Sequence, residues 1–179
     1  MPVENERKFV LHDPHGALER ALGNVRPAIP RKAIRQGYLD TVGLRIRRFD
    51  QDGRVSHIFS YKRPVDDVMV EIEREIDAVD FERLWKLRRE ALEKVRYSIA
   101  AGDCQWDIDF FKDGGRTYFA LAEVEMPEGR EEPPPPPAIL APYIEFLVER
   151  GDERFSSKKL ADPAYARRLA VGVPAAAAD

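Results

Sequence analysis

The chain has 179 residues, of which 44% are apolar and 34% are charged, and its net charge is −3. This length can bury the core of one domain. The near balance of 29 basic and 32 acidic residues argues against a nucleic-acid-binding surface, which would need a strong basic excess. Cys104 is the only cysteine, so an intrachain disulfide is excluded and a reducing compartment is favoured. No secretory signal opens the chain and no apolar run approaches the ~20 residues of a membrane span, so we expect a cytoplasmic protein without a membrane partner.

Strand patterns dominate the chain. Alternating apolar and polar residues predict eight strands, at residues 2–10, 35–41, 43–50, 56–63, 68–77, 93–99, 104–112 and 117–126. The turn sequences Asp-Gln-Asp-Gly at 50–53 and Asp-Gly-Gly at 113–115 indicate hairpins. Connections this short join antiparallel neighbours.

Helices are expected between and after these strands. Asp13-Pro14 predicts a helix over 13–23, and Asp80 is a candidate cap for a helix over 79–91. Apolar spacing predicts a third helix over 138–150, after the stiff proline run 133–137, and a short helix follows near 163–170. We expect one domain over residues 1–170 and a disordered, alanine-rich tail over 171–179.

Charged residues recur at every second position of the predicted strands, and such residues share one face of a strand. The first strand carries Glu4, Glu6 and Lys8, and later strands repeat the pattern with like charges. These later residues are Arg45 and Arg47; Glu71, Glu73 and Glu75; Lys94 and Arg96; Asp107 and Asp109; and Glu123 and Glu125, with Lys62 ending the fourth strand.

Two interpretations of this pattern compete. In an ordinary sandwich the charged face would meet water and the apolar face would form the core. In a closed barrel the charges would line the interior, and the apolar face would point outward under the helices. The second arrangement needs compensation of the buried charges, which a polyanion with its divalent cations would supply.

The ordered set of motifs resembles the CYTH superfamily, the triphosphate tunnel metalloenzymes. Residues 4–8 are similar to that family's ExExK signature, and the likeness covers residues 3–161 in the family's order. The further matching segments are Arg-Gln-Gly-Tyr-Leu at 35–39, Leu-Arg-Ile-Arg at 44–47, Tyr-Lys at 61–62, Glu-Ile-Glu at 71–73, Glu-Lys-Val-Arg-Tyr at 93–97, Trp-Asp-Ile-Asp at 106–109, Ala-Glu-Val-Glu at 122–125 and Ser-Lys-Lys-Leu-Ala at 157–161. The resemblance implies an α+β, mainly antiparallel fold: an eight-stranded closed β-barrel with flanking helices.

Within the superfamily the chain most resembles the short bacterial tripolyphosphatases. The resemblance therefore implies Mg²⁺- or Mn²⁺-dependent hydrolysis of inorganic tripolyphosphate to pyrophosphate and phosphate. The alternatives are a nucleoside or thiamine triphosphatase, a class IV adenylate cyclase, and a non-catalytic polyphosphate-binding module. The expected partner is a small-molecule triphosphate, and a homodimer is possible.

Matching positions imply roles for individual residues. The expected metal ligands are Glu4, Glu6 and Glu125, with Glu123 and Asp109 as additional acids and a second metal among Glu71, Glu73, Asp107 and Asp109. Oxygen ligands suit Mg²⁺ or Mn²⁺, and the chain has no Cys/His cluster for zinc. The expected substrate-binding residues are Lys8, Arg45, Arg47, Lys62, Lys94, Arg96 and Lys158, with adjacent Lys159 as an alternative to the last.

Lys8, Tyr38 and Lys94 are the expected catalytic residues. Tyr38 matches a tyrosine that pairs with the signature lysine, here Lys8, and the pair could protonate the leaving phosphate. Arg35 is a further phosphate-binding candidate, although its face of the strand differs from that of Tyr38.

Overall fold

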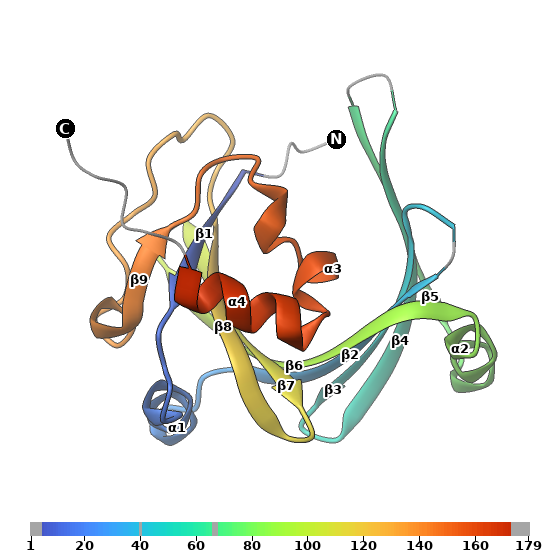
Figure 1. Cartoon of the computed structure of the whole chain (residues 1–179), viewed down its shortest axis with the longest axis horizontal. Coiled ribbons are helices and arrows are strands. Elements are labelled where there is room, and N and C mark those ends of the chain that lie inside the picture. The colour runs from blue at the N-terminus through green and yellow to red at the C-terminus, as the bar shows by residue number, and fades with distance from the viewer. Residues whose placement is uncertain (1–4, 40, 66–67, 173–179) are drawn as a thin grey trace.

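The protein folds around one curved antiparallel sheet (Figure 1). The computed structural model describes residues 5–39, 41–65 and 68–172, and it places nine strands within them. The strands are β1 (Glu6–Leu11), β2 (Arg31–Leu39), β3 (Leu44–Gln51), β4 (Arg54–Val65), β5 (Val68–Ile76), β6 (Arg88–Ala101), β7 (Cys104–Asp113), β8 (Arg116–Glu125) and β9 (Ile144–Leu147). The helices are α1 (Ala17–Asn24), α2 (Ala78–Trp85), α3 (Ser157–Leu160) and α4 (Pro163–Gly172), with 3₁₀ turns η1 (Ala141–Tyr143) and η2 (Glu153–Phe155).

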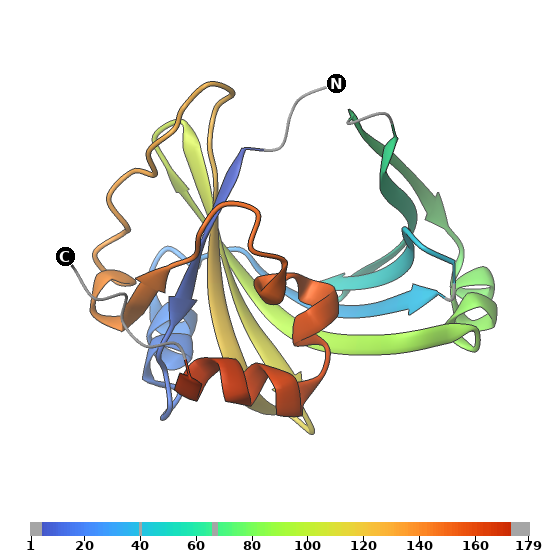
Figure 2. The ribbon, with the colours of Figure 1, turned by 45° about the horizontal axis from the view of Figure 1, so that its top comes forward.

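The sheet is open, which corrects the expected closed barrel of eight strands. Its order among the described residues is β5-β4-β3-β2-β6-β7-β8-β1-β9, so β5 and β9 are the two edges. Closing a barrel would require β5 to pair with β1, but β1 pairs with β8 on one side and with β9 on the other. A strand has two hydrogen-bonding edges, and those of β1 pair with β8 and β9, so β5 cannot pair with β1 and close the sheet. The result is a deeply curved sheet (Figures 1 and 2), and we call its concave side the hollow.

The ninth strand arises where the sequence predicts a helix over 138–150, and that prediction is wrong. The segment forms η1 and then β9, in which Ile144 and Phe146 are half-buried and Glu145 and Leu147 are exposed. This is a period of two, which suits a strand rather than a helix. Phe146 pairs with Val10 of β1, so the segment is held by main-chain hydrogen bonds at the sheet edge.

The other predicted elements form with shifted ends. Helix α1 starts four residues after Asp13, whose carboxylate accepts hydrogen bonds from the amides of Leu18 and Glu19 at 3.1 and 3.2 Å. Helix α2 is capped by Asp77 rather than by Asp80, since the Asp77 carboxylate accepts from the Asp80 amide at 2.8 Å. It ends at residue 85, and the rest of the predicted helix belongs to β6. Helix α4 confirms the short helix predicted near 163–170 and includes residues 171 and 172, whereas the remainder of the predicted tail, 173–179, lies outside the described residues.

Both predicted hairpins are confirmed. The β3–β4 turn has positive φ at Asp52 (53°) and Gly53 (80°), and the β7–β8 turn has positive φ at Gly114 (55°) and Gly115 (80°). Two consecutive residues of positive φ match the twist of adjacent strands, and this conformation favours glycine, asparagine and aspartate.

Apolar residues cover the two faces of the sheet differently. On the convex face, α1 buries Leu18 and Leu22 against β6, β7, β8 and β1, and α2 buries Phe81 and Trp85 against β2 and β3. On the concave face, α3 and α4 sit in the hollow (Figure 2) and cover only part of the sheet, where Leu160 packs near Phe111. This apolar part of the hollow contains Val10, Leu92, Phe111, Phe119 and Leu121 of the sheet together with Phe155, Leu160 and Ala166. None of the described helices is long and apolar enough to cross a membrane.

Candidate functional site

The repeated charges of the strands point into the hollow. In β7, Trp106, Ile108 and Phe110 pack into the convex-side core, so the alternating residues Asp107 and Asp109 face the concave side. The same reasoning places Lys8 of β1 and Glu123 of β8 beside them, since Phe9, Ala122 and Val124 belong to the convex-side core. The structure therefore agrees with the second interpretation of the charge pattern, in an open hollow instead of a closed tunnel.

Arg96 of β6 is the centre of one group of charges. Its Nε donates to Asp109 Oδ1 at 2.7 Å and its Nη2 donates to Asp109 Oδ2 at 2.6 Å. Its Nη1 donates to Asp107 Oδ2 at 2.7 Å, and Nη2 also donates to Glu123 Oε2 at 3.1 Å. Burial lowers the pKa of Arg96, but Asp109 and then Asp107 outweigh it, so the pKa stands above its ordinary value. The guanidinium thus joins acids from β7 and β8 in one network.

Asp109 is fully buried and is held by two cations. Lys94 Nζ donates to Asp109 Oδ2 at 2.6 Å, and the Lys94 side chain is only 5% exposed. Burial alone would raise the pKa of Asp109, but Lys94 and Arg96 together bring it below its ordinary value. Lys94 also lies 5.4 Å from the Phe111 ring, at the boundary with the apolar part of the hollow. The predicted catalytic residue Lys94 is therefore placed beneath the site, as the partner of Asp109.

Lys8 occupies the exposed side of the same group. Its Nζ lies 3.0 Å from Glu6 Oε1 and 3.2 Å from Glu123 Oε1. Burial lowers the pKa of Lys8, but Glu123 and Glu6 raise it by more, so the ammonium form is favoured. The predicted ligand Glu4 lies outside the described residues.

We call Glu6, Lys8, Lys94, Arg96, Asp107, Asp109 and Glu123 the β1–β8 cluster.

A second group of charges lies on the other arm of the sheet, and we call Arg45, Arg47, Lys62, Glu71 and Glu73 the β3–β5 cluster. Arg45 Nη2 is 2.8 Å from Glu71 Oε1 and 3.7 Å from Glu73 Oε1. Arg47 pairs with Glu73, and Lys62 Nζ lies 3.6 Å from Glu71 Oε2. The predicted phosphate-binding bases of this arm are therefore brought together, each beside a carboxylate of β5.

The two clusters do not share acids. A second metal is predicted among Glu71, Glu73, Asp107 and Asp109, but β5 and β7, which carry these two pairs of acids, are five strand-to-strand steps apart in the sheet. Glu71 and Glu73 contact the bases of β3 and β4, whereas Asp107 and Asp109 contact Arg96. The structure does not bring these two pairs of acids together.

Arg47 carries a buried donor without a partner. Its Nε is fully buried and forms no hydrogen bond among the described residues. Burial lowers the pKa of Arg47, and the neighbouring Arg45 lowers it further. An unpaired buried N–H costs about 1–3 kcal/mol, because the group loses its water without gaining an acceptor. A phosphoryl oxygen is an acceptor that could satisfy this guanidinium.

Tyr38 lies on β2, between the two clusters. Gln36 Nε2 donates to the Tyr38 hydroxyl at 2.6 Å, and burial raises the pKa of Tyr38 above its ordinary value. Lys158 Nζ lies 5.9 Å from the centre of the Tyr38 ring, which places the C-terminal base at the site. The predicted pairing of Tyr38 with Lys8 is not formed in this arrangement, in which Lys8 contacts Glu6 and Glu123.

Three polar residues of the site were missed by the sequence reasoning. Gln36 and Ser60 are buried, Ser60 Oγ accepts from Arg45 Nε at 3.0 Å, and Ser98 donates to Asp107 at 2.6 Å. Each stands two positions from a predicted site residue on its strand, so the period of two was the signal that could have found them.

The acids of β1 and β8 provide ligands suited to a hard cation. Within residues 5–39, 41–65 and 68–172, no three acidic, histidine or cysteine side chains converge as a preformed metal site. However, Glu6 lies directly opposite Glu125 in the β1–β8 ladder, and Lys8 lies opposite Glu123. Carboxylates facing each other across a ladder repel, and a divalent cation would remove that cost. Oxygen donors alone fit Mg²⁺ or Mn²⁺, so Glu6, Glu123 and Glu125 are the described residues that could hold the ion.

Comparisons with known proteins agree with the motifs. Neither family models nor curated proteins give a match. Among solved structures, the chain is similar to one described as the inorganic triphosphatase NE1496, with 26% identity, a TM-score of 0.53 and coverage of 90% of this chain and 95% of that one. A second structure, described as the hypothetical protein NE1496, gives 27% identity and a TM-score of 0.54, covering 89% of this chain and 97% of that one.

These findings support a triphosphate tunnel fold of the CYTH type. The similarity to NE1496 extends over nearly the whole length of both chains, and the ordered motifs cover residues 3–161 of this chain. The PH1819 protein from Pyrococcus horikoshii OT3 shares the fold, with 18% identity, a TM-score of 0.50 and coverage of 96% of this chain and 92% of that one. In this protein the charged strand faces line an open hollow partly filled by the C-terminal helices.

Proposed function

We propose that the protein hydrolyses inorganic tripolyphosphate to pyrophosphate and phosphate in a reaction that depends on Mg²⁺ or Mn²⁺. The observation that supports this most is the buried Nε of Arg47, which has no hydrogen-bond partner among the described residues. It faces the hollow, into which both arms of the sheet also direct other basic side chains. Phosphoryl transfer relies mainly on positioning and on stabilising charge, and bases on both sides of a phosphate chain supply both. The similarity to a structure described as an inorganic triphosphatase favours the same substrate class.

The contacts that the basic residues now make indicate different roles for them in binding substrate. Arg45, Arg47 and Lys62 would exchange carboxylate partners for phosphoryl oxygens, since both are anionic oxygen acceptors and the charge-assisted contact is kept. Arg96 would keep its contacts with Asp109 and offer an already oriented guanidinium. Such preorganisation lowers the cost of stabilising the transition state.

The acids on β1 and β8 would hold the divalent ion. Glu6 and Glu125 face each other and Glu123 lies on the same side of the sheet. When bound, the ion would neutralise phosphate charge and favour deprotonation of an attacking water. Lys8, between Glu6 and Glu123, would keep its charge at neutral pH and contact a terminal phosphate.

Tyr38 would act as a donor. Burial raises the pKa of its hydroxyl, so the group stays protonated at neutral pH and can donate a hydrogen bond to a bridging or leaving oxygen. The hydroxyl now accepts from Gln36 Nε2, which leaves its own proton available for substrate.

Phosphate release from tripolyphosphate, ATP and thiamine triphosphate, each with Mg²⁺ and with Mn²⁺, tests the proposal. We expect the highest kcat/KM for tripolyphosphate and no turnover with EDTA. Equal or better turnover of ATP would contradict the substrate assignment, and formation of cyclic AMP would identify a cyclase. Tight binding of tripolyphosphate without hydrolysis would identify a binding module.

A further inference from the structure

A second basic depression lies on the convex face, on the other side of the sheet from the hollow. It has a volume of about 500 Å³ and lies between α1 and α2, across β2, β3, β6 and β7. This volume is in the range of small-molecule pockets. We call it the outer pocket; its charged convex-face residues are Glu19, Arg31, Arg35, Arg48, Glu93 and Lys112.

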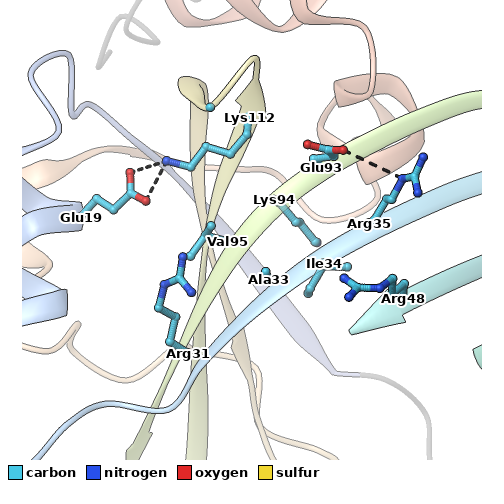
Figure 3. Close-up of a pocket in the computed structure, with 11 residues that line it drawn as sticks. Glu19, Arg31, Ala33, Ile34, Arg35, Arg48, Glu93, Lys94, Val95 and Lys112 are labelled. Atoms are coloured by element: carbon cyan, nitrogen blue, oxygen red, sulfur yellow. Dashed lines mark hydrogen bonds and ion pairs between the residues drawn. The ribbon is translucent and has the colours of Figure 1, made fainter. Parts of the chain in front are cut away.

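Small residues form the floor of the outer pocket. Ala33 of β2 pairs with Val95 of β6, and both point to the convex side. The longer side chains of Arg31 and Arg35, two positions away on each side of Ala33, stand around this low point. Figure 3 shows Ala33 between Arg31 on one side and Arg35 and Arg48 on the other.

The two carboxylates that line the outer pocket do not neutralise the charge of all of its arginines. Glu19 is taken by Lys112, whose Nζ lies 2.7 and 2.6 Å from its two carboxylate oxygens (Figure 3). In the described part of the chain, Glu93 forms an ion pair only with Arg35, at 4.0 Å, and its side chain is 65% exposed. Arg31 forms no ion pair with any residue in the described part of the chain.

Two of the arginines face each other across neighbouring strands. Arg35 of β2 lies directly opposite Arg48 of β3 in the ladder. Like charges in this position are destabilising, and the carboxylates near the pair, Glu82, Glu93 and Asp50, offset only part of this cost because each lies 3.3 to 4.0 Å away. Other contacts hold both in place: Arg35 lies 4.0 Å over the Trp85 ring and its Nη1 is 3.9 Å from Glu82 Oε1, which is 62% exposed, and Arg48 Nη2 donates to Asp50 at 3.3 Å.

We propose that the outer pocket binds a small phosphate-bearing anion, such as a short polyphosphate or a phosphomonoester, at a site separate from the hollow. Arginine matches the oxygens of a phosphate with two parallel donors, and Arg31, Arg35 and Arg48 line one depression with an apolar floor. The bound anion compensates the Arg35–Arg48 repulsion. Anion binding in the outer pocket is expected whether or not the hollow hydrolyses tripolyphosphate.

Calorimetric titration of the full chain with pyrophosphate, in EDTA and at low ionic strength, tests this proposal. We expect binding that weakens at least about tenfold in Arg48→Gln and in Arg31→Gln, because each removes one charged contact. Arg83→Gln is the matched control, since Arg83 is exposed on α2 and pairs with Asp80 alone among the described residues. Arg47→Gln, in the hollow, is the second control and should leave the outer-pocket binding in place.

The outcomes separate this site from the hollow. Titration with citrate compares an anion of similar charge without phosphate, and titration with glycerol phosphate compares a monoester with the diphosphate; both phosphate compounds should lose affinity in Arg48→Gln. Wild-type affinity in both Arg48→Gln and Arg31→Gln, loss of all binding in Arg47→Gln, or citrate binding as tight as that of pyrophosphate would overturn the proposal. Arg31 is exposed, so Arg31→Gln decides the test if Arg48→Gln fails to fold.

Discussion

Arg96 and Asp109 face each other across β6 and β7 and are joined by two parallel hydrogen bonds, Nε to Oδ1 at 2.7 Å and Nη2 to Oδ2 at 2.6 Å. This bidentate geometry fixes the plane of the guanidinium. Lys94 contributes a third hydrogen bond to the same carboxylate from below. The orientation of Arg96 is thus determined by the fold before any ligand binds.

Asp109→Asn should strongly destabilise the fold. The change leaves the buried Lys94 without its counter-charge, and breaking one partner of a buried pair costs about 3–5 kcal/mol in the free energy of unfolding. Urea denaturation followed by circular dichroism measures this. Asp103→Asn removes an exposed pair with Arg130 and should cost at most about 1 kcal/mol. Equal effects of the two substitutions would show that the buried pair does not support the fold.

The same carboxylate should make stability depend on acid pH. Lys94 and Arg96 hold the pKa of Asp109 below its ordinary value of 3.8 despite burial. Its contribution is therefore fully present above pH 3.8 and is lost as the pH falls through the lower folded-state pKa. The free energy of unfolding measured from pH 6 to pH 2 should fall less steeply below pH 4 in Asp109→Asn than in wild type. Parallel curves would refute the depressed pKa.

Arg47→Lys should reduce turnover of tripolyphosphate while keeping the charge. Lysine lacks the planar fork and the buried Nε that a phosphoryl oxygen would satisfy. We expect kcat/KM to fall on the order of 10²-fold, as for loss of one preorganised donor. Arg74→Lys is the control, because Arg74 is exposed on β5 and its flanking positions, Glu73 and Glu75, share the other face. Unchanged kcat/KM in Arg47→Lys, with a loss of thermal stability only, would assign Arg47 a structural role.

Lys158→Ala and Lys159→Ala separate the two adjacent C-terminal bases. Lys158 lies over the Tyr38 ring, so its removal should raise the KM for tripolyphosphate several-fold. Lys159 is exposed on the same short helix and its removal should leave KM unchanged. A larger effect of Lys159→Ala would mean that α3 presents the other lysine to the substrate.

The sequence predicted which side of each strand faces the core, but it did not predict that the sheet stays open. In β7 the alternation of Trp106, Asp107, Ile108 and Asp109 correctly separated the core side from the charged side, because burial on one face imposes a period of two. The sequence of the β9 segment predicts a helix, since a short apolar run fits either period. Its pairing with β1, which keeps the sheet open, depends on contacts between residues far apart in the chain.

The sequence also does not predict which acidic residue of the site contacts which basic residue. Arg96 meets Asp109 only because β6 and β7 pair in one register, and a shift by one residue would move Asp109 to the other face. Single-strand patterns carry no information on which acid meets which base. The resemblance implies a second metal among Glu71, Glu73, Asp107 and Asp109, whereas the sheet order separates β5 from β7.

The most direct test of the central claim compares tripolyphosphate hydrolysis by wild type and Glu6→Gln across a titration of Mg²⁺ or Mn²⁺. Glu6 is exposed and faces Glu125, so the substitution removes a candidate metal ligand at little cost to the fold. We predict metal-dependent turnover in wild type and in the control Glu128→Gln, an exposed loop residue, and a loss of at least about 10²-fold in Glu6→Gln. Full activity of Glu6→Gln at every metal concentration, or phosphate release that persists in EDTA, would contradict a metal-dependent triphosphatase in the hollow.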